Sequence, residues 1–237
     1  HKLKIEAGQG SFSIGTKGIS SGKYDAFVEK EDKIYWNSFD DFYTPSGSPW
    51  PRYFRYSGND IGFIEWSKKR EIEGFTWRPY NDVLLNLEES KIREFSLCVE
   101  KCNADLILGE NIYHIILSGE LENIKIKKCS KIPRVSFVVD SVKNQEENYK
   151  IPLYSVLSEA ECVNIYNSPL SKPFDCTSLL QFKNLKELGL NGNLVNVNIL
   201  KELKKLESLE IRYVPDLTEL PELITWKNLK YFIAWNV

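Results

Sequence analysis

The 237-residue sequence has no methionine and only two histidines, His1 and His114. Metal sites built from several histidines are therefore excluded, and a catalytic nucleophile–histidine pair would need His114. Because His114 lies in the apolar run NIYHIILSG, we expect it to be a structural residue of a strand. We expect no catalysis, no metal and no cofactor. The absence of Met also leads us to expect a tag remnant or a removed leader before His1.

Long apolar runs and an excess of one charge are also missing. No stretch of roughly 18 apolar residues occurs, so we expect no membrane-spanning helix. The 31 basic and 33 acidic side chains leave a net charge of -2, which provides no basic field for nucleic acid or anionic lipid. We therefore expect neither a nucleic-acid partner nor a membrane span.

The five cysteines are an odd number, and no N-x-S/T glycosylation sequence accompanies them. The chain is long enough to build a core without disulfides, so this pattern favours a reducing compartment, and we expect a cytoplasmic protein. A secreted protein with a removed signal peptide remains the alternative. We expect Cys98 and Cys102 to be buried thiols.

Two glycine-containing segments resemble nucleotide-binding motifs and fail in detail. The segment from Gly18 to Lys23 is one residue short of a phosphate-binding loop, and Tyr24 occupies the position of the magnesium-binding hydroxyl. Gly8 and Gly10 are not followed by a third glycine at the dinucleotide-binding spacing. We expect no nucleotide cofactor.

Composition changes near Tyr80. Residues 1–80 contain one leucine and nine of the 13 glycines, whereas residues 81–237 contain 25 leucines. The first part has short alternating segments, among them SFSIG, YDAFVEKEDKIYW, DIGFIEW and EIEGFTW. This pattern predicts a small, aromatic-rich antiparallel β unit over residues 1–80, with residues 29–32 as a hairpin connection. A second domain is expected over residues 81–237.

Residues 40–60 interrupt those strands with three prolines and predict a long ordered loop. Its aromatic residues are Tyr43, Trp50, Tyr53, Phe54 and Tyr56. The first interpretation is that these rings cover the edge or end of the neighbouring domain. The second is a binding loop, which would allow carbohydrate binding or adhesion because tryptophan and tyrosine faces stack on sugar rings.

A repeat of the form L-x-x-L-x-L-x-x-N organises the C-terminal part. Its copies are Leu185, Leu188, Leu190 and Asn193; Leu206, Leu209, Ile211 and Val214; Leu229, Phe232, Ala234 and Val237; and, more weakly, Ala160, Val163, Ile165 and Ser168. The apolar positions are expected to point inward from short strands, and Asn193 to hydrogen-bond the backbone where the chain turns away. Leucines at intervals of three and four between the strands predict short helices on the other side.

The segment NLKELGLNGNLVNVNILKELKKLESLEI resembles the internalin-type bacterial leucine-rich repeat, and the resemblance covers roughly residues 157–237. It implies an α/β fold leaning to mainly β, in which a leucine-rich-repeat solenoid has a parallel sheet and short convex helices. The resemblance also implies an interaction scaffold, since bacterial immunity, adhesion and scaffolding proteins use such repeats. The pattern departs from the family at Val214 and Val237, which replace asparagine, and at residues 216–221, which suggest an extended return.

Residues 81–140 have a denser rhythm, with apolar pairs 9 to 11 residues apart. The pairs are Leu85/Leu87, Phe95/Leu97, Leu106/Leu108, Ile115/Leu117, Ile124/Ile126 and Val135/Phe137. Two such strands per turn of about 20 residues would place β structure on both faces, continuous with the later repeats. A stacked meander is the alternative. The polar residues 141–150 predict an exposed loop.

The repeat register predicts a docking surface, because residues between the inward leucines alternate outward. We expect a non-catalytic protein–protein interaction module that binds an unidentified protein through this concave face. The partner-binding candidates are Tyr166, Asn191, Glu210, Arg212, Tyr231, Ile233 and Trp235. Aromatic residues beside arginine are typical of an interface hot spot. Capping of the last coil by Ile233 and Trp235 is the structural alternative, and the open terminal strand also permits self-association.

Overall fold

The computed structural model describes residues 11–14, 26–29, 36–37, 53–139, 148–168, 172–214, 222 and 226–236. The chain forms two compact units: unit 1 is His1–Tyr113 with Asn123–Ser130, and unit 2 is His114–Glu122 with Lys131–Val237. Both units are mainly β, as expected, and parallel strand pairs dominate in each, which was expected only for the part after residue 80. Over the described ranges, no helix is both long and apolar enough to cross a membrane.

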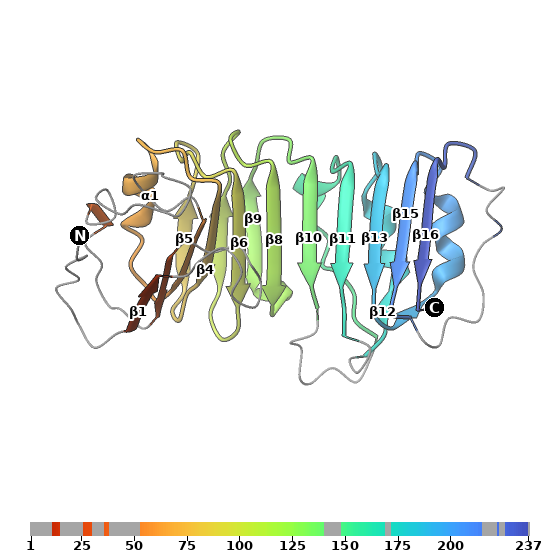
Figure 1. Cartoon of the computed structure of the whole chain (residues 1–237), viewed down its shortest axis with the longest axis horizontal. Helices are drawn as coiled ribbons and strands as arrows, with labels where there is room; N and C mark the ends of the chain where they lie inside the picture. Colours follow the sequence, from red (N-terminus) through yellow and green to blue (C-terminus); the bar gives the residue numbers. More distant parts are fainter. Residues whose placement is uncertain are drawn as a thin grey trace. The chain divides into compact units, whose positions relative to one another are not determined.

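Unit 1 contains two sets of paired strands (Figure 1). Their order is β1-β2-β3-β4-β6 in one set and β5-β7-β9 in the other. The bounds are β1 (Ser11–Ile14), β2 (Ala26–Glu29), β3 (Tyr53–Ser57), β4 (Gly74–Arg78), β5 (Val83–Asn86), β6 (Glu94–Val99), β7 (Ala104–Ile107) and β9 (Ile124–Lys128). Helix α1 (Phe63–Ser67) lies between β3 and β4 in the sequence.

The antiparallel expectation for residues 1–80 holds only for the first pair of strands. β1 pairs antiparallel with β2, whereas β2 with β3 and β3 with β4 are parallel. The predicted hairpin across residues 29–32 is also wrong, because Trp36 and Asn37 form a 3₁₀ turn and β2 pairs with β1 and β3. Parallel neighbours need long crossover connections, which the segments before β3 and β4 supply.

The segment DIGFIEW is helical, contrary to the predicted strand. In α1, Phe63 and Trp66 are three residues apart and both are buried, which is the spacing of one helix face. The Phe63 ring stacks on Phe75 of β4 with 4.1 Å between centroids. The three-residue spacing of Phe63 and Trp66 thus identifies the face of α1 that packs against the strands.

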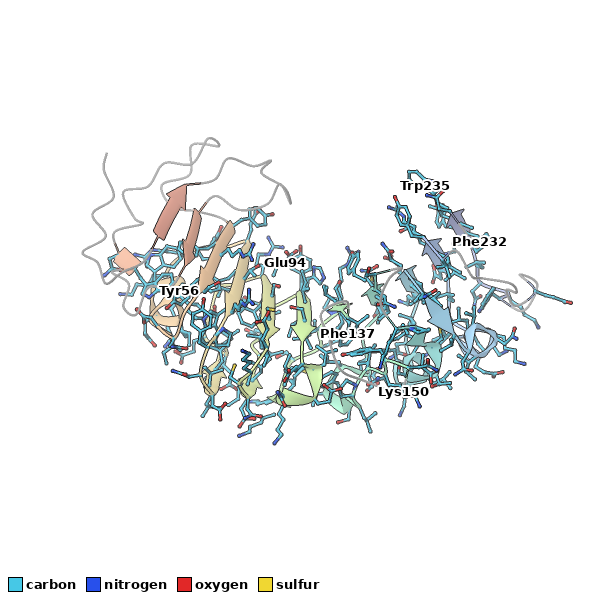
Figure 2. All side chains as sticks on the ribbon, turned by 90° about the horizontal axis from the view of Figure 1, so that it is seen from below. Tyr56, Glu94, Phe137, Lys150, Phe232 and Trp235 are labelled. Atoms are coloured by element: carbon cyan, nitrogen blue, oxygen red, sulfur yellow. The ribbon has the colours of Figure 1, made fainter. Side chains whose placement is uncertain are left out.

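An aromatic core fills unit 1 under β3, β4 and α1. Its rings are all buried and contact one another: Trp36, Phe54, Tyr56, Phe63, Trp66, Phe75 and Trp77. Tyr56, labelled in Figure 2, and Phe54 belong to β3, so they are not part of the long loop predicted over residues 40–60. They are core residues because β3 alternates its side chains inward. Tyr43 and Trp50 lie outside the described residues.

The dense rhythm of residues 81–140 corresponds to strands, as predicted. β5, β7 and β9 pair in parallel order, β4 pairs in parallel with β6, and these two sets alternate along the chain. Parallel pairing of every second strand rules out the stacked meander, in which consecutive strands pair antiparallel. Of the twelve apolar residues in the six pairs, only Ile126 is not fully buried. Strands β4 and β6 pair with each other although they lie on opposite sides of Tyr80 in the sequence. A domain boundary near Tyr80 stays a prediction.

Unit 2 is built on parallel strands in the order β8-β10-β11-β13-β15-β16, whose arrows run side by side in Figure 1. The bounds are β8 (His114–Gly119), β10 (Arg134–Val138), β11 (Cys162–Tyr166), β13 (Glu187–Asn191), β15 (Ser208–Arg212) and β16 (Tyr231–Trp235). Short strands β12 (Phe174–Asp175) and β14 (Leu194–Val195) form a second parallel pair. Three 3₁₀ helices connect the strands, η3 (Ser155–Leu157), η4 (Cys176–Gln181) and η5 (Val197–Glu202). A further 3₁₀ turn, η2, spans Leu121–Asn123.

The register predicted from the repeat is confirmed through β15. Leu188 and Leu190 of β13 and Leu209 and Ile211 of β15 are buried, and they pair side by side. In β16 the strand forms at the predicted place, but its inward residues Phe232 and Ala234 are exposed. Among the described strands β16 has only β15 beside it, so its inner side chains lack the neighbour that buries the others.

The turns after β11 and β13 are held by a buried asparagine, Asn167, and by a left-handed backbone conformation at Gly192. The Asn167 amide donates hydrogen bonds to the carbonyls of Lys172 and Asn193, both at 3.0 Å. Asn167 thus makes a side-chain link to backbone of the kind that the repeat predicts for Asn193, and for Asn193 itself the link stays a prediction. Gly192, at the matching position of the next strand, has φ 88°, and a Cβ there would lie 2.2 Å from the Asn167 carbonyl oxygen.

Leu209→Ala should destabilise the protein by about 2 to 5 kcal/mol, because it removes a fully buried side chain from the inner side of β15. Leu153→Ala is the matched control, since Leu153 is 79% exposed and should change the free energy of unfolding by less than about 0.5 kcal/mol. Urea denaturation of both variants gives the comparison. A loss below about 1 kcal/mol at Leu209 would contradict the register.

Candidate functional site

The outward side chains of the unit 2 strands form three straight rows. In-register parallel pairing places each outward residue beside its counterpart on the next strand. We call these rows together the outward face. From β8 to β16 the rows are His114, Arg134, Cys162, Glu187, Ser208 and Tyr231; Ile116, Ser136, Asn164, Gly189, Glu210 and Ile233; and Ser118, Val138, Tyr166, Asn191, Arg212 and Trp235.

The central part of the outward face is polar and internally bonded. The Arg134 guanidinium lies 3.5 Å from the Glu187 carboxylate, reaching past β11. A side chain on Gly189 would collide with Asn164, since a Cβ there would lie 2.4 Å from the Asn164 Oδ1. Glycine at this point therefore leaves room for the asparagine of the neighbouring strand.

The end of the outward face at β15 and β16 is aromatic. The Arg212 guanidinium lies 5.9 Å from the Trp235 ring centroid and also pairs with Glu210. The Tyr213 ring stacks on the Trp235 ring, with 6.2 Å between the two ring centroids. We call Arg212, Tyr213, Tyr231, Ile233 and Trp235 the Trp235 cluster. Trp235 is 55% exposed, Tyr231 67% and Ile233 50%.

All seven predicted docking residues lie on the outward face, at the positions that the register predicts. Tyr166, Asn191, Arg212 and Trp235 are consecutive in one row, and Figure 2 labels Trp235 at the last strand. Glu210 and Ile233 are neighbours in the middle row, and Tyr231 ends the third. The structure thus brings the residues together, while their role in binding stays a prediction.

Tyr213 is the cluster residue that sequence reasoning missed. It follows Arg212 directly, so strict alternation would point its side chain inward. Its φ of 54° breaks the alternation, and the ring becomes exposed and stacks on Trp235. Positive φ is uncommon for a tyrosine, and no signal in the sequence marks it.

A row of ion pairs borders the outward face where the strands begin. Glu161 bridges Lys131 at 2.7 Å and Lys186 at 2.8 Å, and Glu207 pairs with Lys230 at 2.6 Å. Hydrogen bonds from the Lys131 and Lys186 ammonium groups lower the pKa of Glu161 to about 2. The charges alternate in sign from one strand to the next, so each coil meets an opposite charge on its neighbour.

His114 is a strand residue, as predicted, and its Nε2 lies 2.9 Å from the Ser136 hydroxyl. A serine nucleophile must be reachable by its substrate, but Ser136 is only 1% exposed. The pair therefore joins β8 to β10 and offers no accessible nucleophile.

Two of the cysteines, Cys162 and Cys176, have thiols that burial keeps protonated. All five are free, and Cys102, Cys162 and Cys176 are buried, whereas Cys98 is only half-buried, against the expectation of a buried thiol. Burial raises the pKa of Cys162 to about 11 and that of Cys176 to about 12, which keeps both thiols protonated. The described residues contain no group of three or more His, Cys, Asp or Glu side chains that could hold a metal ion.

A cavity in unit 1 is the place where a small ligand would be sought. It has a volume of about 540 Å³ beside α1, and its lining includes Trp36, Asn37, Trp66 and Arg70. Both tryptophans are buried, and the Arg70 guanidinium lies 5.1 Å from the Trp66 ring centroid. A sugar stacks on an exposed ring face, and none of the tryptophans described in residues 1–80 offers one.

Comparisons with protein-family models, with curated proteins and with solved structures find no match to this chain. What the protein does is therefore inferred from its own residues.

Glu161 should titrate in the folded protein with a midpoint near pH 2, well below the ordinary glutamate value of about 4.3, because two lysines bond its charged form. Lys186→Ala should raise the Glu161 pKa partway back. Since the folded pKa is the lower one, the stability from these pairs is complete above about pH 4.3 and is lost as the pH falls towards 2. Carboxyl NMR titration measures the midpoint, with Lys183→Ala as an exposed lysine control that should leave it unchanged.

Proposed function

We propose that this chain is a non-catalytic protein-recognition module that binds a partner protein through the Trp235 cluster and the outward face. The observation that carries the proposal is the exposed tryptophan in contact with arginine and tyrosine at the end of the sheet. Tryptophan, tyrosine and arginine are the residue types that most often dominate the energy of protein interfaces. A large ring left half in water gains apolar burial when a partner covers it.

The shape of the outward face supports a protein partner over a small molecule. Three rows of side chains on parallel strands make a broad surface, whereas small ligands bind in deep clefts or cavities that enclose most of the ligand. The ion pairs of the central part are already satisfied within the face, so a partner would gain most at its aromatic end. Protein interfaces likewise combine an apolar, aromatic-rich core, which contributes most of the binding energy, with a polar rim.

We further propose that unit 2 is a leucine-rich-repeat solenoid of the internalin type. Support comes from the buried leucines of the repeat, the parallel in-register strands and the 3₁₀ helices η4 and η5 between them. The family resemblance implies immunity, adhesion or scaffolding as the setting. Five free thiols support a cytoplasmic location.

Carbohydrate binding by residues 1–80 is the second candidate, and the burial of the tryptophans described there, Trp36, Trp66 and Trp77, argues against it. A glycan array on the full chain tests it, because saturable binding would favour this function over protein recognition.

Trp235→Ala and Arg212→Ala should each weaken partner binding by about tenfold or more, equivalent to about 1.4 kcal/mol. The full chain and its variants are used to capture partners from the native cell, and the affinity for the recovered protein is then measured by calorimetry. Leu153→Ala is the control, because it removes an exposed apolar side chain outside the outward face. If both cluster variants bind within about threefold of the wild type, the cluster is not the docking site.

A further inference from the structure

Exposed lysines gather on one edge of unit 2, in η5 and on the turns that lead into β13, β15 and β16. None of them forms an ion pair in the part of the chain that the structure describes. We call these residues the lysine strip: Lys183, Lys201, Lys204, Lys205 and Lys227.

Three of the lysines occupy the same position in consecutive repeats. Lys183, Lys204 and Lys227 each stand two residues before the first repeat leucine, which is Leu185, Leu206 and Leu229 in turn. Neighbouring coils touch at this level, because the Asn228 amide donates to the Lys204 carbonyl at 3.0 Å. Since adjacent parallel strands lie roughly 4.8 Å apart, the three lysines form a column of like charge.

The columns beside this one are neutralised within the chain. One residue further along each repeat, the Asn184 amide donates to the Glu159 carboxylate, and the Lys205 ammonium donates to the Asn184 side-chain oxygen. The ion-pair row that borders the outward face alternates acid and base from coil to coil, through Glu161, Lys186, Glu207 and Lys230.

The lysine strip therefore carries positive charge that the folded chain does not compensate. The Lys204 ammonium donates to the Lys201 carbonyl at 2.7 Å, which is a neutral acceptor. A single acid, Glu202, lies within η5 beside these lysines. Like charges on adjacent coils repel one another, so the strip is stabilised when negative charge from outside covers it.

We propose that the lysine strip binds an extended acidic segment of a protein, whose carboxylates follow the column of Lys183, Lys204 and Lys227 from coil to coil. Complementary charge sets the register and orientation of such a contact. The strip lies beyond the ion-pair row and includes no residue of the Trp235 cluster. The proposal therefore does not rest on the proposed function of the outward face.

The chemistry of the strip favours carboxylates over a nucleic acid. Single-stranded nucleic acids stack their bases on aromatic side chains, whereas the rings nearest to the strip in sequence, Phe182 and Trp226, are buried. Residues 182–184, 197–206 and 226–229 contain no arginine, the residue that binds phosphate through two parallel hydrogen bonds. A short row of carboxylates suits single ammonium groups that span three coils.

A fluorescein-labelled peptide of alternating glutamate and serine is the probe, and its binding to the full chain is measured by fluorescence anisotropy. We expect saturable binding that weakens at least tenfold between about 0.05 and 0.5 M NaCl, because salt screens exposed charges. A variant that combines Lys183→Ala, Lys204→Ala and Lys227→Ala should bind about tenfold more weakly, since three exposed ion pairs are lost. A peptide of alternating glutamine and serine should not bind.

The matched control combines Lys69→Ala, Lys91→Ala and Lys101→Ala, which removes three exposed lysines from unit 1 and gives the same net charge. It should bind the glutamate peptide like the wild type. Arg212→Ala should do the same, because Arg212 belongs to the outward face. Circular dichroism verifies that each variant is folded, and the salt series on the wild type needs no variant.

The proposal is overturned if the wild type shows no saturable binding of the glutamate peptide up to about 1 mM at low salt. It is also overturned if the strip variant binds like the wild type, or if the unit 1 control loses as much affinity. Tighter binding of an oligothymidylate than of the peptide would assign the strip to nucleic acid instead. An equal loss in Arg212→Ala would place the peptide on the outward face, so this failure is distinct from a failure of the Trp235 cluster to bind its own partner.

Discussion

In-register parallel pairing is the constraint on which unit 2 depends. Each strand from β8 to β15 sets the position of the next residue by residue, so a side chain is inward or outward along the whole set at once. A register shift of one residue would move every buried leucine side chain to the solvent-exposed face of the sheet. The buried stack of apolar side chains, the straight outward rows and the row of ion pairs at the strand starts all follow from that pairing.

Much of unit 2 could be predicted because its chemistry is local and repeats. The spacing of the apolar residues alone predicts strands β13 and β15, at Leu188, Leu190, Leu209 and Ile211. The register then places Arg212 beside Trp235. What the repeat could not reveal are departures made by single residues. Tyr213 adopts positive φ and joins the Trp235 cluster, and Phe232 occupies an inward position that is exposed in the part of the chain the structure describes.

Unit 1 was harder to predict for a physical reason. Its core is made of rings, and aromatic residues suit strands, loops and binding surfaces alike. Phe63 and Trp66 therefore could be assigned to a strand, although their spacing of three fits the helix they form. Phe54 and Tyr56 follow a proline-rich segment and so suggested a loop. In the structure Phe54 packs on Trp66 of α1 and Phe75 of β4, and Tyr56 packs on Trp36, contacts that no local sequence pattern indicates.

The alternation of side chains along each strand divides the work of unit 2 between two sets of residues. Inward positions carry the folding free energy, and outward positions such as Ser208, Glu210 and Tyr231 contribute little to it. Substitutions at the exposed outward positions therefore change the surface without removing a buried contact, whereas Gly189 and the buried Ser136 do not share this freedom. The character of the exposed surface and the packing of the core are therefore set by nearly separate groups of residues, so the chemistry of the outward face can differ while the strand arrangement stays the same.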